Sequence, residues 1–168
     1  WPVLDADQYA REALAPNTSA SQAVAQRFGA VVGNAADLDR KALGRIVFSD
    51  AEERRWLETL VHPVVRDRFQ QELVRHSQAP VVVLMIPLLF ETGLEALCSE
   101  VWLVDCEPHQ QLERLMLRSG LNEADAQARL AAQWPLSRKR PLADRVIDNR
   151  GSADALEAAV NRCDPPSL

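Results

Sequence analysis

Glycine and lysine are scarce in this sequence, and neither occurs in the pattern of a phosphate-binding loop. Such a loop is rich in glycine and carries a lysine and a serine or threonine, which together cradle the phosphates of a nucleotide. The chain of 168 residues has six glycines in all, and its lysines are Lys41 and Lys139. The chain therefore lacks the segment with which nucleoside-type kinases hold the phosphates of ATP.

Cysteine, long apolar runs and excess positive charge are scarce too, and each scarcity excludes a class of protein. Three widely separated cysteines, Cys98, Cys106 and Cys163, form no zinc or redox motif and favour reduced thiols in a cytoplasmic protein. No apolar run reaches the length of a membrane span, which predicts no membrane partner. The net charge of -5 argues against a general nucleic-acid binder.

The remaining composition is typical of one soluble globular domain, with or without an insertion. Hydrophobic residues make up 47% and charged residues 26% of the chain, which are ordinary values. Positive charge is concentrated between Arg129 and Arg145, where five basic residues stand against one acidic residue, Asp144. Such a cluster suits a small phosphorylated ligand, although a run of charges is more often a solvated surface.

Four short apolar stretches predict buried strands, and helical patterns separate them. The predicted strands are Val3–Leu4, Val81–Ile86, Val101–Val104 and Val146–Ile147. Strands that alternate with helices predict an α/β fold with a doubly wound parallel sheet. The stretch 17–76 shows no strand pattern and predicts a helical insertion. Within it, Asp50 and Glu53 resemble a capping box, and Pro63 is expected to break or restart the helix that they open.

The run Val81–Ile86 is apolar at six consecutive positions, which is typical of a strand covered on both faces. It stops at Pro87, and three bulky apolar residues, Leu88 to Phe90, and the carboxylate of Glu91 follow. Open parallel sheets bind their ligands beyond the carboxyl ends of the strands, so this junction predicts a substrate wall. The alternative is that the apolar residues belong to the core and that Glu91 is solvated at a helix start.

Two carboxylates, Asp5 and Asp7, follow the first strand and are expected at the ligand edge of the sheet. In phosphoryl transfer, an aspartate accepts the proton of the attacking hydroxyl or helps to hold magnesium. The alternative is a structural one, in which Asp7 is the N-cap of the helix that follows.

Cationic and polar side chains elsewhere in the chain could bind a ligand. Arg114 and Arg118 lie four residues apart on one predicted helix, and Arg138–Arg140 is a basic cluster further along. Guanidinium groups bind phosphate oxygens in a bidentate way, so these residues resemble a lid that closes over phosphates, unless they form a solvated face. Asn149 could bond a base edge or form a turn, and His62 could contact a ligand or be structural.

Six segments occur in a characteristic order along the chain: VLDADQYAREAL, ALGRIVF, HPVVR, IPLLFETGL, RLMLRSGL and LADRVIDNRGS. Together they resemble the dephospho-coenzyme A kinase family, and the resemblance extends from Val3 to about Val160. It implies transfer of the γ-phosphate of ATP, with magnesium, to the ribose 3′-hydroxyl of dephospho-coenzyme A, the last step of coenzyme A synthesis. It also implies a phosphate-loop kinase core with a helical coenzyme A subdomain and a mobile lid.

The resemblance also implies a role for each candidate residue. Asp7 would be the base for the ribose hydroxyl. The acceptor pocket would be lined by Arg11, His62, Pro87, Leu88 and Glu91. The ATP side and the lid would contain Arg114, Arg118, Lys139 and Arg140, with Asn149 beside the adenine. Leu136 occupies a position where a basic residue is expected, so the identity of the lid cation that reaches the phosphates stays open, as do the metal ligands.

The same resemblance divides the chain into regions. Residues 1–16 and 77–163 would form the core domain, with the lid at about 118–141. Residues 17–76 would form the acceptor subdomain, and residues 164–168 a disordered tail.

The family's first strand, phosphate loop and first helix, roughly thirty residues long, have no counterpart after Trp1. We therefore expect the chain to begin partway through a larger polypeptide, and we expect negligible ATP-dependent transfer by the chain alone. Two other functions stay open at this point. One is a different nucleotide or small-molecule kinase with the same core, and the other is a non-catalytic remnant that binds a coenzyme A-like ligand or a protein partner.

Overall fold

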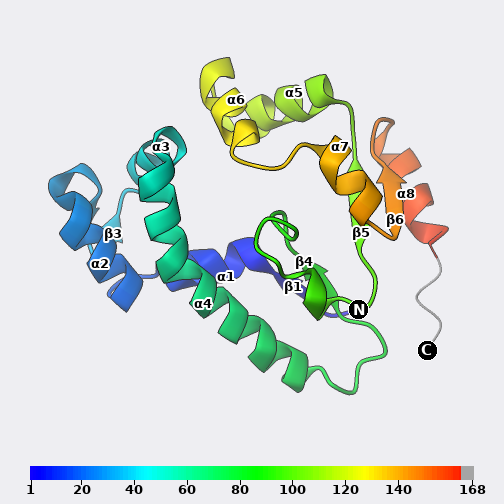
Figure 1. The fold of residues 1–168 in the computed structure, drawn as a ribbon, viewed down its shortest axis with the longest axis horizontal. Helices are drawn as coiled ribbons and strands as arrows, with labels where there is room; N and C mark the ends of the chain where they lie inside the picture. Colours follow the sequence, from blue (N-terminus) through cyan, green and yellow to red (C-terminus); the bar gives the residue numbers. More distant parts are fainter. Residues whose placement is uncertain (164–168) are drawn as a thin grey trace. The chain divides into compact units, whose positions relative to one another are not determined.

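A computed structural model describes residues 1–163, and the predicted tail at 164–168 lies outside them. The chain forms two compact units, Trp1–Pro87 and Leu88–Leu168 (Figure 1). The predicted division into a core, an acceptor subdomain and a lid stays a prediction. No helix among the described residues is long and apolar enough to cross a membrane.

The first unit contains most of the long helices of the chain. Its elements in order are β1 (Val3–Asp5), α1 (Ala6–Ala13), α2 (Ser19–Phe28), a 3-10 turn (Gly29–Val31), β2 (Gly33–Asn34), β3 (Asp37–Leu38), α3 (Arg40–Ser49), α4 (Ala51–Arg75) and β4 (Val83–Met85). The second unit contains a 3-10 turn (Glu95–Leu97), β5 (Trp102–Asp105), α5 (Pro108–Ser119), α6 (Glu123–Ala131), α7 (Leu136–Lys139), a second 3-10 turn (Arg140–Leu142), β6 (Arg145–Asp148) and α8 (Ala153–Asn161).

Each unit is built on one pair of parallel strands, which agrees with the predicted α/β class. In the first unit β1 pairs with β4, and Asp5 lies opposite Met85. In the second unit β5 pairs with β6, and Asp105 lies opposite Asp148. Because the strands of each pair run in the same direction, the residues that follow them emerge at the same edge.

The stretch 17–76 was predicted to lack strands, and this prediction is wrong in one place. β2 and β3 form a short antiparallel hairpin, in which Gly33 lies opposite Leu38. The Asn34 side chain closes its turn by accepting hydrogen bonds from the backbone N–H groups of Ala36 and Asp37. Strands of two residues are too short to show alternation of apolar and polar side chains, so the sequence pattern could not reveal them.

The predicted break at Pro63 is also wrong, because α4 continues through it to Arg75. A proline inside a helix costs about 3 kcal/mol, since it removes one backbone hydrogen bond and crowds the preceding turn. Burial of one apolar face of α4 outweighs this cost. Asp50 caps the helix as predicted, but Glu53 does not close the box. The Glu53 carboxylate instead binds Arg27, at 2.6 Å.

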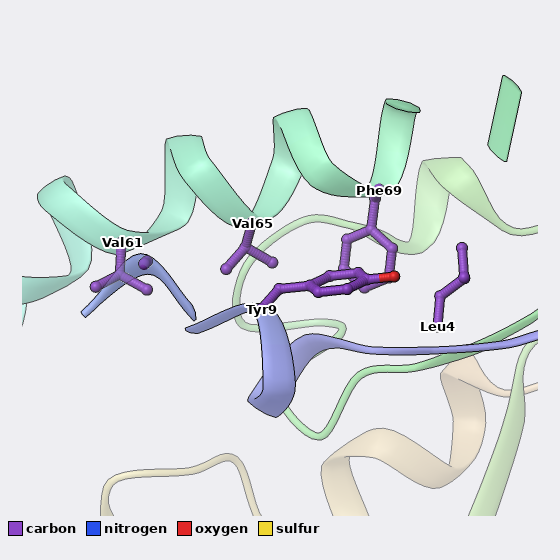
Figure 2. Close-up of a cluster of buried hydrophobic side chains, with 6 residues drawn as sticks. Leu4, Tyr9, Val61, Val65 and Phe69 are labelled. Atoms are coloured by element: carbon purple, nitrogen blue, oxygen red, sulfur yellow. The ribbon is translucent and has the colours of Figure 1, made fainter. Parts of the chain in front are cut away.

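The apolar face of α4 packs against β1 and α1 to form the core of the first unit. Val61, Val65 and Phe69 point from α4 toward the segment that carries Leu4 and Tyr9 (Figure 2). The rings of Tyr9 and Phe69 meet edge to face, with their centroids 5.2 Å apart. A second cluster joins α2, the 3-10 turn that follows it and α3 through Val24, Val32, Ala42, Leu43 and Val47. The fold of this unit therefore depends on the side chains of α4 that are spaced four residues apart.

The strand predicted at Val81–Ile86 is present but short, and it is less covered than expected. β4 spans Val83–Met85, its first two residues are half-buried, and Met85 is 48% exposed. Among the described residues β4 has a hydrogen-bonded neighbour on one side only, which is β1. A strand at the edge of a sheet is less buried than a central one, which explains the difference.

We predict that Phe69→Ala destabilises the first unit by about 3–5 kcal/mol, because Phe69 is 0% exposed and its truncation leaves a cavity beneath α4. Urea unfolding measures this loss. Val74→Ala is the matched control, since Val74 lies on the same helix and is 75% exposed. Equal effects of the two substitutions would contradict the packing described here.

Candidate active site

The carboxylates of Asp5, at the end of β1, and Asp7, in the first turn of α1, have different roles, and only one is structural. Asp5 is the N-cap of α1, and its carboxylate accepts hydrogen bonds from the backbone N–H groups of Asp7 and Gln8 at 2.8 and 3.3 Å. The alternative assignment of the N-cap to Asp7 is thus wrong, because the helix begins two residues earlier. Within residues 1–163 the Asp7 carboxylate has no hydrogen bond or ion pair, and Asp7 is exposed. Asp7 is therefore the carboxylate that is available to a ligand.

Arg11 lies one helical turn after Asp7 on α1 and is also exposed. Residues four apart on a helix are neighbours on its surface, so the helix presents a carboxylate beside a guanidinium group. Within the described part of the chain the Arg11 side chain has no ion-pair partner. The start of α1 can therefore offer a proton acceptor and an anion-binding group to one ligand.

His62 lies in an open groove of about 620 Å³ that follows the surface of α4. The groove is lined by Arg55, Glu58, Thr59, His62, Pro63, Arg66, Asp67 and Gln70. Its lining contains two arginines, two acidic residues and one half-buried histidine, so it is of mixed charge. Such a surface can bind a polar ligand that carries phosphate groups.

The segment after β4 crosses from Pro87, the last residue of the first unit, to Leu88, the first residue of the second. Beyond it, the Thr92 hydroxyl donates to the backbone carbonyl of Leu88 at 2.8 Å, and the Leu94 N–H donates to the carbonyl of Leu89. These bonds fold the segment into a compact turn. Its only acidic side chain, Glu91, is thereby held on the protein and is not solvated.

Glu91 and Lys139 form a buried ion pair within the second unit. The Lys139 ammonium lies 2.7 Å from Glu91 Oε1, and the two side chains are 6% and 13% exposed. The same carboxylate oxygen accepts the backbone N–H of Trp134, at 2.8 Å. Glu91 Oε2 is buried without a hydrogen-bond partner among the described residues. This alternative to a solvated Glu91 was not foreseen from the sequence.

Asp105 forms a second buried cluster, at the carboxyl end of β5. It is 1% exposed, its Oδ2 accepts a hydrogen bond from Arg140 Nε at 2.9 Å, and Arg140 Nη2 lies 2.8 Å from the same oxygen in an ion pair. Arg150 lies 3.6 Å from the same oxygen. The hydrogen bond with Asp105 raises the pKa of the Arg140 guanidinium. Sequence reasoning missed Asp105 and Arg150, although the position of an aspartate at the end of an apolar strand was the signal that could have found the first.

The remaining candidates on the ATP side differ in how firmly they are held. Arg114 donates a hydrogen bond to the backbone carbonyl of Asn149 at 2.8 Å, and the Asn149 N–H donates to the carbonyl of Asp105. Arg118, at the end of α5, is exposed and has no ion-pair partner among residues 1–163. The structure thus brings Arg114, Arg140 and Asn149 together around the ends of β5 and β6, and leaves Arg118 available.

No preformed metal site exists among the described residues, since no three His, Cys, Asp or Glu side chains gather in a way that could hold an ion. The described cysteines are all free thiols, and burial raises the pKa of both Cys98 and Cys106. These two thiols therefore stay protonated at neutral pH and are poor metal ligands and nucleophiles.

Comparison with known proteins gives one consistent result. The family model for dephospho-CoA kinase matches residues 1–155. A dephospho-CoA kinase of Parasynechococcus marenigrum (strain WH8102) is 71% identical over 163 residues, which is 97% of this chain and 82% of that protein. A dephospho-CoA kinase of Synechococcus sp. (strain CC9605) is 63% identical over 156 residues, with 92% and 75% of the two chains covered.

Solved structures agree with these sequences. A crystal structure of a protein from Thermus thermophilus superimposes with a TM-score of 0.76 at 42% identity, over 96% of this chain and 82% of that one. A dephospho-CoA kinase from Campylobacter jejuni superimposes with a TM-score of 0.65 at 28% identity, over the same shares of the two chains.

We predict that Asp5→Ala lowers the stability of the first unit by about 1 kcal/mol, because α1 loses its capping acceptor. Asp7→Ala should leave stability within about 0.5 kcal/mol of the unsubstituted chain, since an exposed residue without partners is replaced. Urea unfolding of the two variants provides the comparison. A larger loss for Asp7→Ala than for Asp5→Ala would reverse the assignment of the cap.

Proposed function

The chain belongs to the dephospho-CoA kinase family, which phosphorylates dephospho-coenzyme A in coenzyme A synthesis with ATP as its nucleotide substrate, and we propose that Asp7 is the base of this reaction. The observation that carries the proposal is the separation of tasks between the two aspartates after β1. Asp5 holds the helix, and Asp7 stands exposed on its first turn. A carboxylate in this position can accept a proton without loss of the cap.

In the proposed step, the oxygen of the ribose 3′-hydroxyl attacks the γ-phosphorus of ATP. Asp7 accepts the proton of this hydroxyl at the same time. The bond from the γ-phosphorus to the bridging oxygen breaks, and ADP leaves. Little covalent chemistry falls to the protein in such a transfer, so catalysis comes from positioning and from neutralising the charge on the phosphoryl oxygens. Arg11, one turn from Asp7, would hold an anionic group of the acceptor close to the base.

The acceptor side extends to α4 and to the segment after β4. We assign His62 and the groove around it to the binding of dephospho-coenzyme A, because the groove is open and contains arginine side chains. Pro87 and Leu88 would offer apolar contacts to the same ligand. The mixed charge of the groove suits a ligand that combines a diphosphate with a long polar chain.

The nucleotide side belongs to the second unit. Arg118 would neutralise charge on the transferred phosphoryl group, because it is exposed and has no ion-pair partner among the described residues. Asn149, together with Arg114 bound to its carbonyl, would lie beside the adenine. Magnesium would accompany ATP and supply charge neutralisation. Magnesium usually takes only one or two protein carboxylates and fills its other positions with water and phosphate oxygens.

We also propose that the protein acts in the cytoplasm and on small molecules alone. The free thiols at Cys98, Cys106 and Cys163 fit a reducing compartment. The net charge of -5 is unfavourable for a nucleic-acid partner.

We predict that Asp7→Asn in the native protein lowers kcat by about 10²–10⁴-fold, because an amide cannot take the proton from the attacking hydroxyl. The assay is ATP-dependent phosphorylation of dephospho-coenzyme A. Asp5→Asn is the matched control, since asparagine keeps the capping acceptor and kcat should be retained. Retained activity in Asp7→Asn would remove Asp7 as the base.

We predict that Arg118→Met lowers kcat by about 10²-fold or more, because a charge that stabilises the transition state is lost. The melting temperature should stay unchanged, since the exposed Arg118 side chain has no ion-pair partner among the described residues. Arg162→Met removes an exposed charge from another helix end of the same unit and should leave kcat unaltered. An unaltered kcat in Arg118→Met would contradict the assignment of this cation to the phosphates.

A further inference from the structure

We propose that Glu91 and Lys139 are a positioning pair, which fixes the segment 134–140 beside the nucleotide, and that Lys139 does not itself contact the phosphates. This inference rests on the proposed function and deepens it. It concerns how the basic cluster Arg138–Arg140 is held, and not which residue takes the proton.

The ion pair holds the segment at both ends of the short helix α7. Glu91 Oε1 accepts the N–H of Trp134 before the helix and the ammonium of Lys139 at its last residue, at 2.8 and 2.7 Å. One carboxylate oxygen thus joins two points that are five residues apart in the sequence. Between them, the guanidinium of Arg138 lies over the Trp134 ring, 3.3 Å from its centroid.

The residue after Lys139 is anchored as well, at the ligand edge of the second unit. Arg140 binds the buried Asp105 at the carboxyl end of β5 through a hydrogen bond and an ion pair. The N–H of Asn149, after β6, donates to the backbone carbonyl of Asp105. The segment 134–140 therefore lies along the strand ends where an open parallel sheet binds its ligand. A shift of this segment would move the groups that we assign to ATP.

Burial decides what Lys139 can do. Its side chain is 6% exposed, and release of the ammonium toward a phosphate would leave the Glu91 carboxylate buried and unpaired. Loss of one partner of a buried ion pair is strongly destabilising, because the other charge is left uncompensated. The second oxygen of Glu91 already lacks a hydrogen bond among the described residues, so the carboxylate depends on Lys139 and on the Trp134 N–H. A lysine that holds a buried carboxylate in this way is suited to orient its neighbours.

The experiment is a double-substitution cycle in the native protein, with steady-state kinetics for both substrates. Lys139→Met and Glu91→Gln should each raise KM for ATP and lower kcat. We expect kcat/KM for ATP to fall about tenfold or more in each variant. In Lys139→Met, KM for dephospho-coenzyme A should change less than about twofold. The double variant Glu91→Gln with Lys139→Met should recover at least several-fold in kcat/KM over Lys139→Met alone. It leaves no unpaired charge, and the glutamine carbonyl can still accept the Trp134 N–H.

The competing role for Lys139 predicts the opposite outcome. If its ammonium contacts the phosphates, the double variant is as inactive as Lys139→Met even where its melting temperature recovers, and that result would overturn the proposal. Glu53→Gln is the control, because it breaks the Arg27–Glu53 ion pair of the other unit, and it should alter neither KM. Asp7→Asn tests the proposed base separately, so failure of one proposal does not imply failure of the other.

Amide hydrogen exchange on the unsubstituted protein provides a measurement that does not depend on any variant. The Trp134 N–H should exchange slowly without nucleotide, because Glu91 accepts it in a buried site. The N–H of Leu121, which lies between α5 and α6 and has no described acceptor, should exchange fast. Equally fast exchange at Trp134 would show that the segment is not fixed and would overturn the proposal.

Discussion

Polar groups that emerge at the ends of parallel strands must be satisfied, and the architecture of both units depends on how aspartates meet this requirement. β1, β5 and β6 each end in an aspartate, at Asp5, Asp105 and Asp148. Asp5 accepts the first N–H groups of α1, Asp105 accepts Arg140, and Asp148 accepts the N–H of Arg150. Each carboxylate fixes, through these contacts, a segment of the chain that lies at the end of its strand. The candidate functional groups therefore lie on segments whose direction is set by a neighbouring structural carboxylate.

Burial separates residues of the same chemical type into different roles. Asp7 and Arg118 are exposed and lack ion-pair partners among the described residues, whereas Lys139 and Asp105 are buried in ion pairs. An exposed charged group can bind a ligand at little energetic cost, because it leaves no partner in the protein. A buried charged group must keep its partner. The same argument applies to the aspartates after β1, since the two lie two residues apart and only Asp5 is engaged by the backbone. The charges without described partners, Asp7 and Arg118, are therefore the ones that we propose for direct contact with the reacting groups.

Much of the fold was predictable because the signals are local. Apolar runs located the four parallel strands, Gly120 ends α5 with φ 61°, and Asn122 and Ser152 cap α6 and α8. Predictions from local sequence signals failed where contacts in the tertiary structure compete with the local preference. α4 passes through Pro63 because its opposite face is buried on α1, and Glu53 leaves its capping role for Arg27 on another helix. In both cases the deciding contact is far away in the sequence, and no pattern of neighbouring residues contains it.

The sequence by itself determined the α/β class and the family, and it predicted a base, an acceptor region and a basic cluster. These depend on residue types, on short-range periodicity and on the order of motifs, all of which are written in the chain. Only the tertiary structure decided that Asp5 and not Asp7 caps the helix, that Glu91 pairs with Lys139, and that Arg140 forms an ion pair with Asp105. Glu91 and Lys139 are 48 residues apart, and the energy of a charge depends on its burial and on its partner. Both are properties of the folded chain.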